Sequence, residues 1–238
     1  MGPRSTVQRT NLLTSLILVF PLLIFYGVGV LFSHGAMNGA DFLTQSLLLL
    51  LGPRGYLAFQ GGLVLAFLVL VLTLRRRQDF ELNQFVPVVL ESGIYALTMG
   101  TLIIFVMVDL LGIDPRLAAV AADPLAGKGI FDRLVMAGGA GVHEELVFRL
   151  ILLNGVTVFG RKVLDLRPWL AVGVAFLVSS LLFAGAHHMG PLGESLRLGV
   201  FTYRAMAGLF FAALYHYRSF AIAVYTHSIY DAYVFLLH

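Results

Sequence analysis

The chain has 238 residues, of which 59% are hydrophobic and only 12% are charged, and its mean hydropathy is +0.89. This composition excludes an ordinary soluble domain and is typical of a polytopic membrane protein. The lack of cysteine excludes disulfides, thiolate ligands, a cysteine nucleophile and palmitoylation, and the formal charge of +3 comes from arginine clusters beside apolar runs, which favours lipid headgroups over nucleic acid.

Seven apolar stretches approach the roughly 20 residues that a helix needs to cross the hydrocarbon core of a bilayer. We therefore predict an all-α, polytopic membrane helix bundle with about seven transmembrane helices. A shorter run from Ser46 to Leu51, ended by Gly52 and Pro53, predicts a re-entrant or interfacial helix, or an eighth span. The expected spans, in chain order, are Asn11 to Phe32, Tyr56 to Leu74, Ser92 to Leu111, Leu134 to Phe159, Pro168 to His187, Leu196 to Tyr215 and Phe220 to Leu237.

The basic residues in the short connections predict the orientation of the bundle, because such residues are enriched on the cytoplasmic side. All of them fall on one side if the N-terminus is cytoplasmic. We therefore expect an integral multi-pass protein with a cytoplasmic N-terminus and an external C-terminus. The basic residues in question are Arg4, Arg9, Arg75, Arg76, Arg77, Arg161, Lys162, Arg167 and Arg218.

Polar residues concentrate in the C-terminal half of the chain. A charged residue at membrane depth is costly and normally faces the interior of a bundle or a water-filled cavity, where it has a function. We therefore expect residues 1–127 to form a scaffold of transmembrane helices and residues 128–238 to form a catalytic helix bundle. The polar residues on the last four expected spans include Glu144, Glu145, Arg149, His187, Arg204, His227 and Asp231.

The fourth expected span carries three of these charged residues. Glu145 precedes Arg149 by four positions, the favourable order for an ion pair within a helix. Glu144 is rotated by about 100 degrees from Glu145 in an ideal helix, lacks an obvious local counter-charge, and suits a general base or acid. A purely structural salt-bridge network is the alternative. The zinc motif H-E-x-x-H is not completed, because Val147 follows where a second histidine is needed, so His143 is predicted to flank the site.

The fifth and seventh expected spans each carry a histidine with a partner four residues away. Phe183 shares a helix face with His187, and its ring could hold the imidazole in place. His227 and Asp231 have the same spacing, which lets an imidazole and a carboxylate converge on one ligand or water. A hydrogen-bonded core histidine and a helix-bridging polar pair are the corresponding structural alternatives.

These groups are sufficient to hydrolyse an amide in two ways. In one, His187, His227 and Asp231 bind a divalent metal such as zinc while Glu144 accepts a proton from water. In the other, no metal takes part: Glu144 with His187 activates water, and His227 with Asp231 stabilises the oxyanion. The sequence does not choose between them.

The three patterns together resemble a known family. In order and spacing, on successive apolar helices, they are similar to those of the CPBP family of intramembrane proteases, which includes CaaX prenyl endopeptidases and proteins of the bacteriocin-processing and abortive-infection types. The patterns are E-E-x-x-x-R at Glu144, Glu145 and Arg149, F-x-x-x-H at Phe183 and His187, and H-x-x-x-D at His227 and Asp231.

The resemblance implies an all-helical core bundle and cleavage of peptide bonds near the membrane. It implies catalytic roles for Glu144, His187 and His227, with Glu145 and Arg149 in support. Prenyl-processing relatives usually have asparagine in place of Asp231. An ionised aspartate cannot donate to an oxyanion, so Asp231 is predicted to be a ligand, an orienter of His227 or a protonated donor.

We therefore predict an intramembrane endopeptidase that hydrolyses a peptide bond near the terminus of a membrane-anchored or lipidated protein or peptide, using water activated by Glu144. Its partners would be that substrate and the lipid bilayer. A proton- or ion-coupled carrier and a catalytically silent membrane protein that binds a partner are the alternatives. A carrier would be favoured by an inverted repeat with matching broken spans, which the sequence does not contain.

Two geometric expectations follow from a shared site. Glu144 and His187 must lie within ~10 Å of each other, because a bridging water reaches about one hydrogen bond each way. To bring the two residues to the same depth, residues 128–139 must be partly interfacial, or the fourth helix must be long and tilted. Arg204 is either a clamp for a substrate carboxylate or a structural partner of Asp231 or Glu144.

Overall fold

The computed structural model describes residues 10–33, 42–113, 127–189 and 195–237. Within these ranges the chain is helical apart from short turns and connections, and no strand is present. The predicted all-α bundle is therefore confirmed. Its helices are α1 (Leu12–Phe32), α2 (Phe42–Leu74), α3 (Phe85–Phe105), α4 (Ile130–Gly139), α5 (Asn154–Lys162), α6 (Pro168–Ala186), α7 (Leu198–Tyr217) and α8 (Phe220–Leu237), with a short 3-10 turn, η2 (Leu82–Gln84), and the π-helical segments η3 (Val106–Leu110), η5 (Ala140–Glu144) and η6 (Leu146–Leu153).

Six helices in the described part of the chain are long and apolar enough to cross a membrane. They match six of the expected spans, so the prediction of a polytopic membrane protein is confirmed. The remaining expected span also exists, as an unbroken helical rod made of α4, η5, η6 and α5. It is less apolar than the other six because it carries Glu144, Glu145 and Arg149. The six helices are Leu12–Phe32, Arg54–Leu74, Leu82–Leu110, Pro168–Ala186, Leu198–Tyr217 and Phe220–Leu237.

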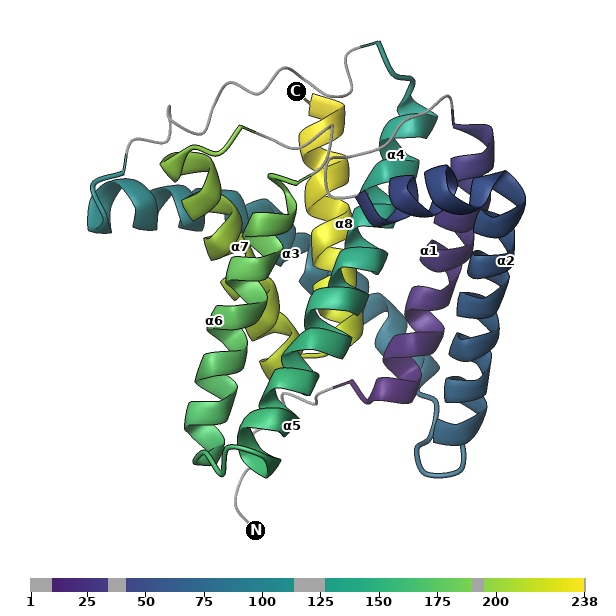
Figure 1. The fold of residues 1–238 in the computed structure, drawn as a ribbon, viewed down its shortest axis with the longest axis horizontal. Coiled ribbons are helices and arrows are strands. Elements are labelled where there is room, and N and C mark those ends of the chain that lie inside the picture. Colours follow the sequence, from purple (N-terminus) through teal and green to yellow (C-terminus); the bar gives the residue numbers. More distant parts are fainter. Residues whose placement is uncertain (1–9, 34–41, 114–126, 190–194, 238) are drawn as a thin grey trace.

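Helix α2 has a sharp kink at Gly52, whose backbone has φ 65° and ψ 179°. This conformation favours glycine, because a side chain is strained at positive φ. The part of α2 before the kink lies across the bundle, whereas the part after it runs alongside α1 (Figure 1). The run that ends at Gly52 thus has the arrangement expected of an interfacial helix, and it does not form an eighth span.

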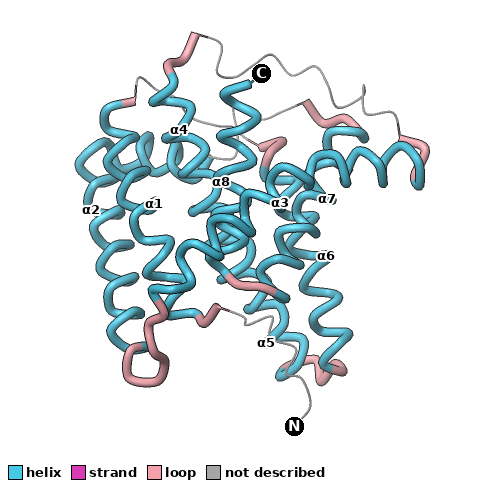
Figure 2. Tube along the Cα trace, turned by 180° about the vertical axis from the view of Figure 1, so that it is seen from behind, coloured by secondary structure: helices cyan, strands magenta, loops and turns pink. Residues whose placement is uncertain are grey.

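Helix α8 lies at the centre of the bundle. It packs against α1, α3, α4, α7 and η5, and Figures 1 and 2 show it between the α6–α7 pair and the α1–α2 pair. In its most apolar stretch 50% of the residues are buried, compared with 11% for the span in α2. The polar residues of α8 therefore face protein, whereas most of the α2 span is left for lipid.

The ends of the helices are consistent with the predicted topology. Helix α1 begins at the lower end of the bundle in Figure 1, where the α2–α3 and α5–α6 connections also lie, and α8 ends at the upper end. Those two connections and the last turn of α5 carry most of the basic residues on which the predicted orientation rests. Which end faces the cytoplasm stays a prediction.

Candidate active site

The helical rod from α4 to α5 changes its hydrogen-bonding register where the charged residues occur. Segment η5 ends at Glu144, and η6 begins at Leu146 and contains Arg149. Such π-helical segments are frequently found at functional sites, because they turn side chains away from the directions that a regular α-helix allows. The rod is tilted in the bundle (Figure 1), so the long, tilted fourth helix expected from the sequence is present.

Close contact between this rod and α8 depends on a glycine. A Cβ atom added to Gly141 would lie 2.8 Å from the backbone nitrogen of Ser228 and 2.9 Å from the carbonyl oxygen of Val224. Only a residue without a side chain fits at this position. The contact brings His227, next to Ser228, against the rod at the level of Glu144.

The predicted ion pair between Glu145 and Arg149 is present and fully buried. Arg149 Nε lies 3.2 Å from Glu145 Oε2, and both side chains are 0% exposed. Arg149 Nη2 also donates a hydrogen bond to the carbonyl oxygen of Gly208 at 3.1 Å. The guanidinium lies over the ring of Phe183, 4.4 Å from its centroid. These contacts explain how a cation is retained in the bundle, and they join the rod to α6 and α7.

Two contacts fix the orientation of the His227 ring, one at a ring nitrogen and one on a ring face. Its Nδ1 lies 2.8 Å from Glu145 Oε1, and since an ionised carboxylate can only accept, Nδ1 is assigned as the donor. Phe211 stacks on the ring at a centroid distance of 4.3 Å and an angle of 13°. Nε2 is therefore directed toward Asp231 Oδ2 and Glu144 Oε2, at 3.6 and 3.7 Å.

His187 caps the C-terminal end of α6 and is oriented in a similar way. Its Nδ1 lies 2.9 Å from the carbonyl oxygen of Phe183, which can only accept, so Nδ1 is again the donor. The Phe183 ring lies beside the imidazole, with centroids 4.8 Å apart, as the spacing predicted. His187 Nε2 then lies 3.7 Å from Glu144 Oε2.

The four residues predicted to be catalytic therefore form one cluster. The expected proximity of Glu144 and His187 is confirmed, because their side chains are within 3.7 Å. Relative exposures are 6% for Glu144, 2% for His187, 3% for His227 and 7% for Asp231. The separations between their polar atoms, 3.6 to 3.7 Å, exceed direct hydrogen bonds.

The donor atoms of this cluster are chemically suitable for a divalent metal, since each histidine presents a ring nitrogen whose partner nitrogen is held by an acceptor. In the described part of the chain, however, no group of three or more histidine, aspartate or glutamate side chains is positioned to hold a metal ion. The catalytic steps described below therefore use the side chains alone.

Sequence reasoning missed the contributions of α7. Phe211 stacks on His227, and the Gly208 carbonyl accepts from Arg149. Neither residue type carries a chemical signal, and Phe210 beside Phe211 made the inward face ambiguous. His143 does flank the site as predicted: its ring lies against Tyr26, and its Nδ1 is 3.3 Å from the Gly139 carbonyl oxygen.

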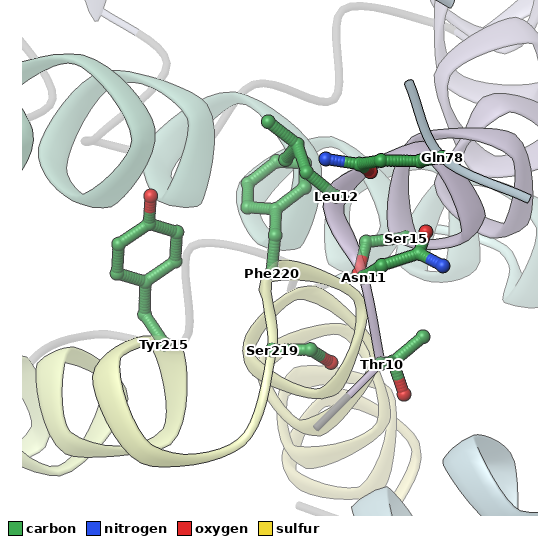
Figure 3. Close-up of a pocket in the computed structure, with 8 residues that line it drawn as sticks. All are labelled: Thr10, Asn11, Leu12, Ser15, Gln78, Tyr215, Ser219 and Phe220. Atoms are coloured by element: carbon green, nitrogen blue, oxygen red, sulfur yellow. The ribbon is translucent and has the colours of Figure 1, made fainter. Parts of the chain in front are cut away.

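A cavity of about 300 Å³ lies elsewhere, near the start of α1 and the α7–α8 connection (Figure 3). None of the residues predicted to be catalytic lines it, and it is open to the surroundings at that end of the bundle. We therefore place the candidate active site at the buried polar cluster and not at this cavity. The lining residues are Thr10, Asn11, Leu12, Ser15, Gln78, Tyr215, Ser219 and Phe220.

Comparisons with known proteins identify the family. The profile of a family described as type II CAAX prenyl endopeptidase, Rce1-like, matches residues 127–233, a range that contains every residue predicted for the site. An uncharacterized 24.3 kDa protein of Escherichia coli is 31% identical over 187 residues, covering 73% of this chain and 81% of that protein. No solved structure matches the chain. The chain thus belongs to the Rce1-like family of type II CAAX prenyl endopeptidases, as the resemblance of its sequence to CPBP proteases indicated.

Proposed function

We propose that the protein is an intramembrane endopeptidase that uses a water molecule activated by Glu144. The observation that carries this proposal is the position of one Glu144 carboxylate oxygen, 3.7 Å from the Nε2 atoms of both His187 and His227. A water molecule among these atoms would be in contact with a base and with two orienting rings. The buried setting strengthens such polar interactions, since little bulk water competes with them.

The reaction then proceeds in two proton transfers. Glu144 accepts a proton from the water while His187 Nε2 holds the water in place, and the water oxygen bonds to the carbonyl carbon of the substrate. When the carbon–nitrogen bond breaks, Glu144 returns the proton to the leaving amine. The products are a new carboxyl group and a new amino group, and Glu144 is ionised again.

His227 is the proposed partner of the oxyanion. To donate from Nε2 it must carry a proton on both ring nitrogens, and Glu145 on one side and Asp231 on the other balance the resulting charge. Asp231, 3.6 Å from His227 Nε2, acts as an orienter in this scheme. Glu145 and Arg149 support the site by fixing the His227 ring and the register of the rod.

The proposed substrate is a protein or peptide that is itself tethered to the membrane or carries a lipid, cleaved near its terminus. The name of the family refers to prenylated CaaX proteins, and a buried site in a helix bundle suits a substrate that is already in the bilayer. In this proposal residues 128–238 form the catalytic bundle, residues 1–127 form the scaffold, and the N-terminus is cytoplasmic.

A zinc-dependent version of the proposal assigns His187, His227 and Asp231 as ligands and keeps Glu144 as the base. When bound, the metal would supply polarisation of the water and of the scissile carbonyl. Metal analysis of the purified, active protein separates the two versions. Full activity with substoichiometric metal contradicts the zinc version, whereas loss of activity on chelation and its return with zinc supports it.

The function is tested with a library of membrane-tethered reporters that differ in sequence and in lipidation near the C-terminus. Each reporter is co-expressed with the wild type, with Glu144→Ala or with His187→Ala, and cleavage is read by mass spectrometry. We expect some reporters to be cut by the wild type alone. Equal processing by all three proteins, at matched expression, contradicts the proposal.

A further inference from the structure

One cation near the site has no role in the mechanism above. Arg204 lies on α7, four residues before Gly208 and seven before Phe211. At about 100 degrees per residue, these spacings place Arg204 on the same helix face, between the directions of Gly208 and Phe211. Since Gly208 accepts from Arg149 and Phe211 stacks on His227, this face of α7 is the one that meets the catalytic cluster.

The position along the helix differs from that of the catalytic contacts. With a rise of about 1.5 Å per residue, Arg204 lies about 10 Å from Phe211 toward the N-terminal end of α7. Its charge still acts on both His187 and Asp231. Arg204 is partly exposed, whereas Arg149 is completely buried, so Arg204 is the more accessible of the two to a ligand.

The net charge of the cluster determines what a nearby cation such as Arg204 would do. Glu144, Glu145 and Asp231 supply three carboxylates, and Arg149 supplies one guanidinium. With the carboxylates ionised, the cluster has an excess of two negative charges when His227 is neutral, and of one when His227 carries the second proton proposed above. A negatively charged group of a substrate would be repelled at close range. A second guanidinium beside the cluster removes this penalty on one side.

We propose that Arg204 binds a carboxylate of the substrate on the leaving side of the scissile bond, either the terminal main-chain carboxylate or an acidic side chain near it. Its planar guanidinium matches a carboxylate with two parallel hydrogen bonds. With five N–H donors, the side chain can keep a contact within the protein and still bind this group. The inference rests on the proposed peptidase function and adds a determinant of which substrates are cut.

The test pairs a change in the enzyme with a change in the substrate. A reporter that the wild type cleaves is synthesised with a C-terminal carboxylate, with a C-terminal amide, and as an amide with glutamate as the last residue. Rates are measured in proteoliposomes for the wild type, Arg204→Gln and Arg204→Lys. Arg161→Gln is the control, because it removes the same charge from an exposed residue in the last turn of α5.

We expect the wild type to prefer the carboxylate over the amide by about 10- to 100-fold in kcat/KM, mainly through KM, as for loss of one charge-assisted pair. Arg204→Gln should cut the carboxylate and the amide at the same low rate. Arg204→Lys should retain part of the preference for the carboxylate, and Arg161→Gln should retain all of this preference. Rescue of the amide by the added glutamate would identify a side-chain carboxylate as a second accepted source.

Several outcomes would overturn the assignment. A wild type that cuts carboxylate and amide equally contradicts it, although the peptidase function would stand. A purely structural role for Arg204 predicts equal losses for both substrates and an unchanged preference. If Arg204→Gln does not fold, the Arg204→Lys variant and the wild-type preference decide. A wild type that cleaves no reporter contradicts the peptidase function and, with it, this inference.

Discussion

At the scale of single residues, the two adjacent glutamates have different surroundings. Glu145 is paired with Arg149 and with His227, and its side chain is fully buried. Glu144 instead faces the Nε2 atoms of two histidines, at 3.7 Å from each. The E-E pair thus places one carboxylate in the ion pair with Arg149 and the other toward the two histidines, because consecutive helical positions point in different directions.

Removal of the Glu145 carboxylate is expected to destabilise the protein as well as inactivate it. In Glu145→Ala the fully buried Arg149 loses its counter-charge, which typically costs about 3–5 kcal/mol. Thermal unfolding in detergent should show a large decrease in the midpoint for Glu145→Ala and little change for Glu144→Gln, which removes a charge next to two histidines. Equal midpoints for Glu145→Ala and the wild type would contradict the structural role.

At the scale of helices, the site is assembled by close packing at residues without side chains. Gly141 lets α8 pack closely against the rod. At Gly208 an added Cβ would lie 2.9 Å from Ser180 Cα, so α6 and α7 also pack closely. Small residues at such positions let helices approach in a membrane. The geometry of the cluster therefore depends on close packing between helices as well as on the polar residues themselves.

Gly141→Ala is expected to displace α8 and to abolish activity. The added methyl group would meet backbone atoms of Ser228 and Val224, which no change of rotamer can move. Gly155→Ala is the matched control on the same rod, because nothing lies within 4 Å of its added Cβ. It should keep full activity and gain up to about 1 kcal/mol in stability. Both are read by reporter cleavage and by thermal unfolding. An active Gly141→Ala variant would show that the approach of α8 is not required.

At the scale of the whole molecule, hydropathy was sufficient for most of the fold. The last expected span, Phe220 to Leu237, coincides with α8, and the first differs from α1 by one residue at its start. The length of an apolar run directly reflects bilayer thickness. The motifs likewise identified the clustered residues, because helical spacing places partners on one face.

The remainder depended on tertiary packing. The π-helical register around Glu144 and the stacking of Phe211 on His227 arise from contacts between helices far apart in the chain. Periodicity within one apolar helix does not reveal its inward face, since both lipid-facing and protein-facing sides are hydrophobic. The kink at Gly52 was signalled by its Gly-Pro pair, but its direction was not.

The orientation of the bundle is a further prediction at this scale, and the lack of cysteine makes it testable. Single cysteines placed in the α2–α3 connection, as Arg76→Cys, and at the end of α8, as Leu237→Cys, occupy exposed positions. An impermeant maleimide should label Leu237→Cys in intact cells and Arg76→Cys only in inverted vesicles. The reverse pattern would invert the topology, and labelling of both from one side would contradict an odd number of crossings.

The central claim is that Glu144 acts as the base for peptide hydrolysis at this buried cluster. The most direct measurement is single-turnover cleavage of an identified reporter by purified protein in proteoliposomes, comparing the wild type with Glu144→Gln and with Glu81→Gln, a glutamate in the connection before α3. We expect Glu144→Gln to fold normally and to be slower by about 10²- to 10⁴-fold, the usual contribution of a general base, while Glu81→Gln matches the wild type. A folded Glu144→Gln protein that cleaves at the wild-type rate would contradict the account.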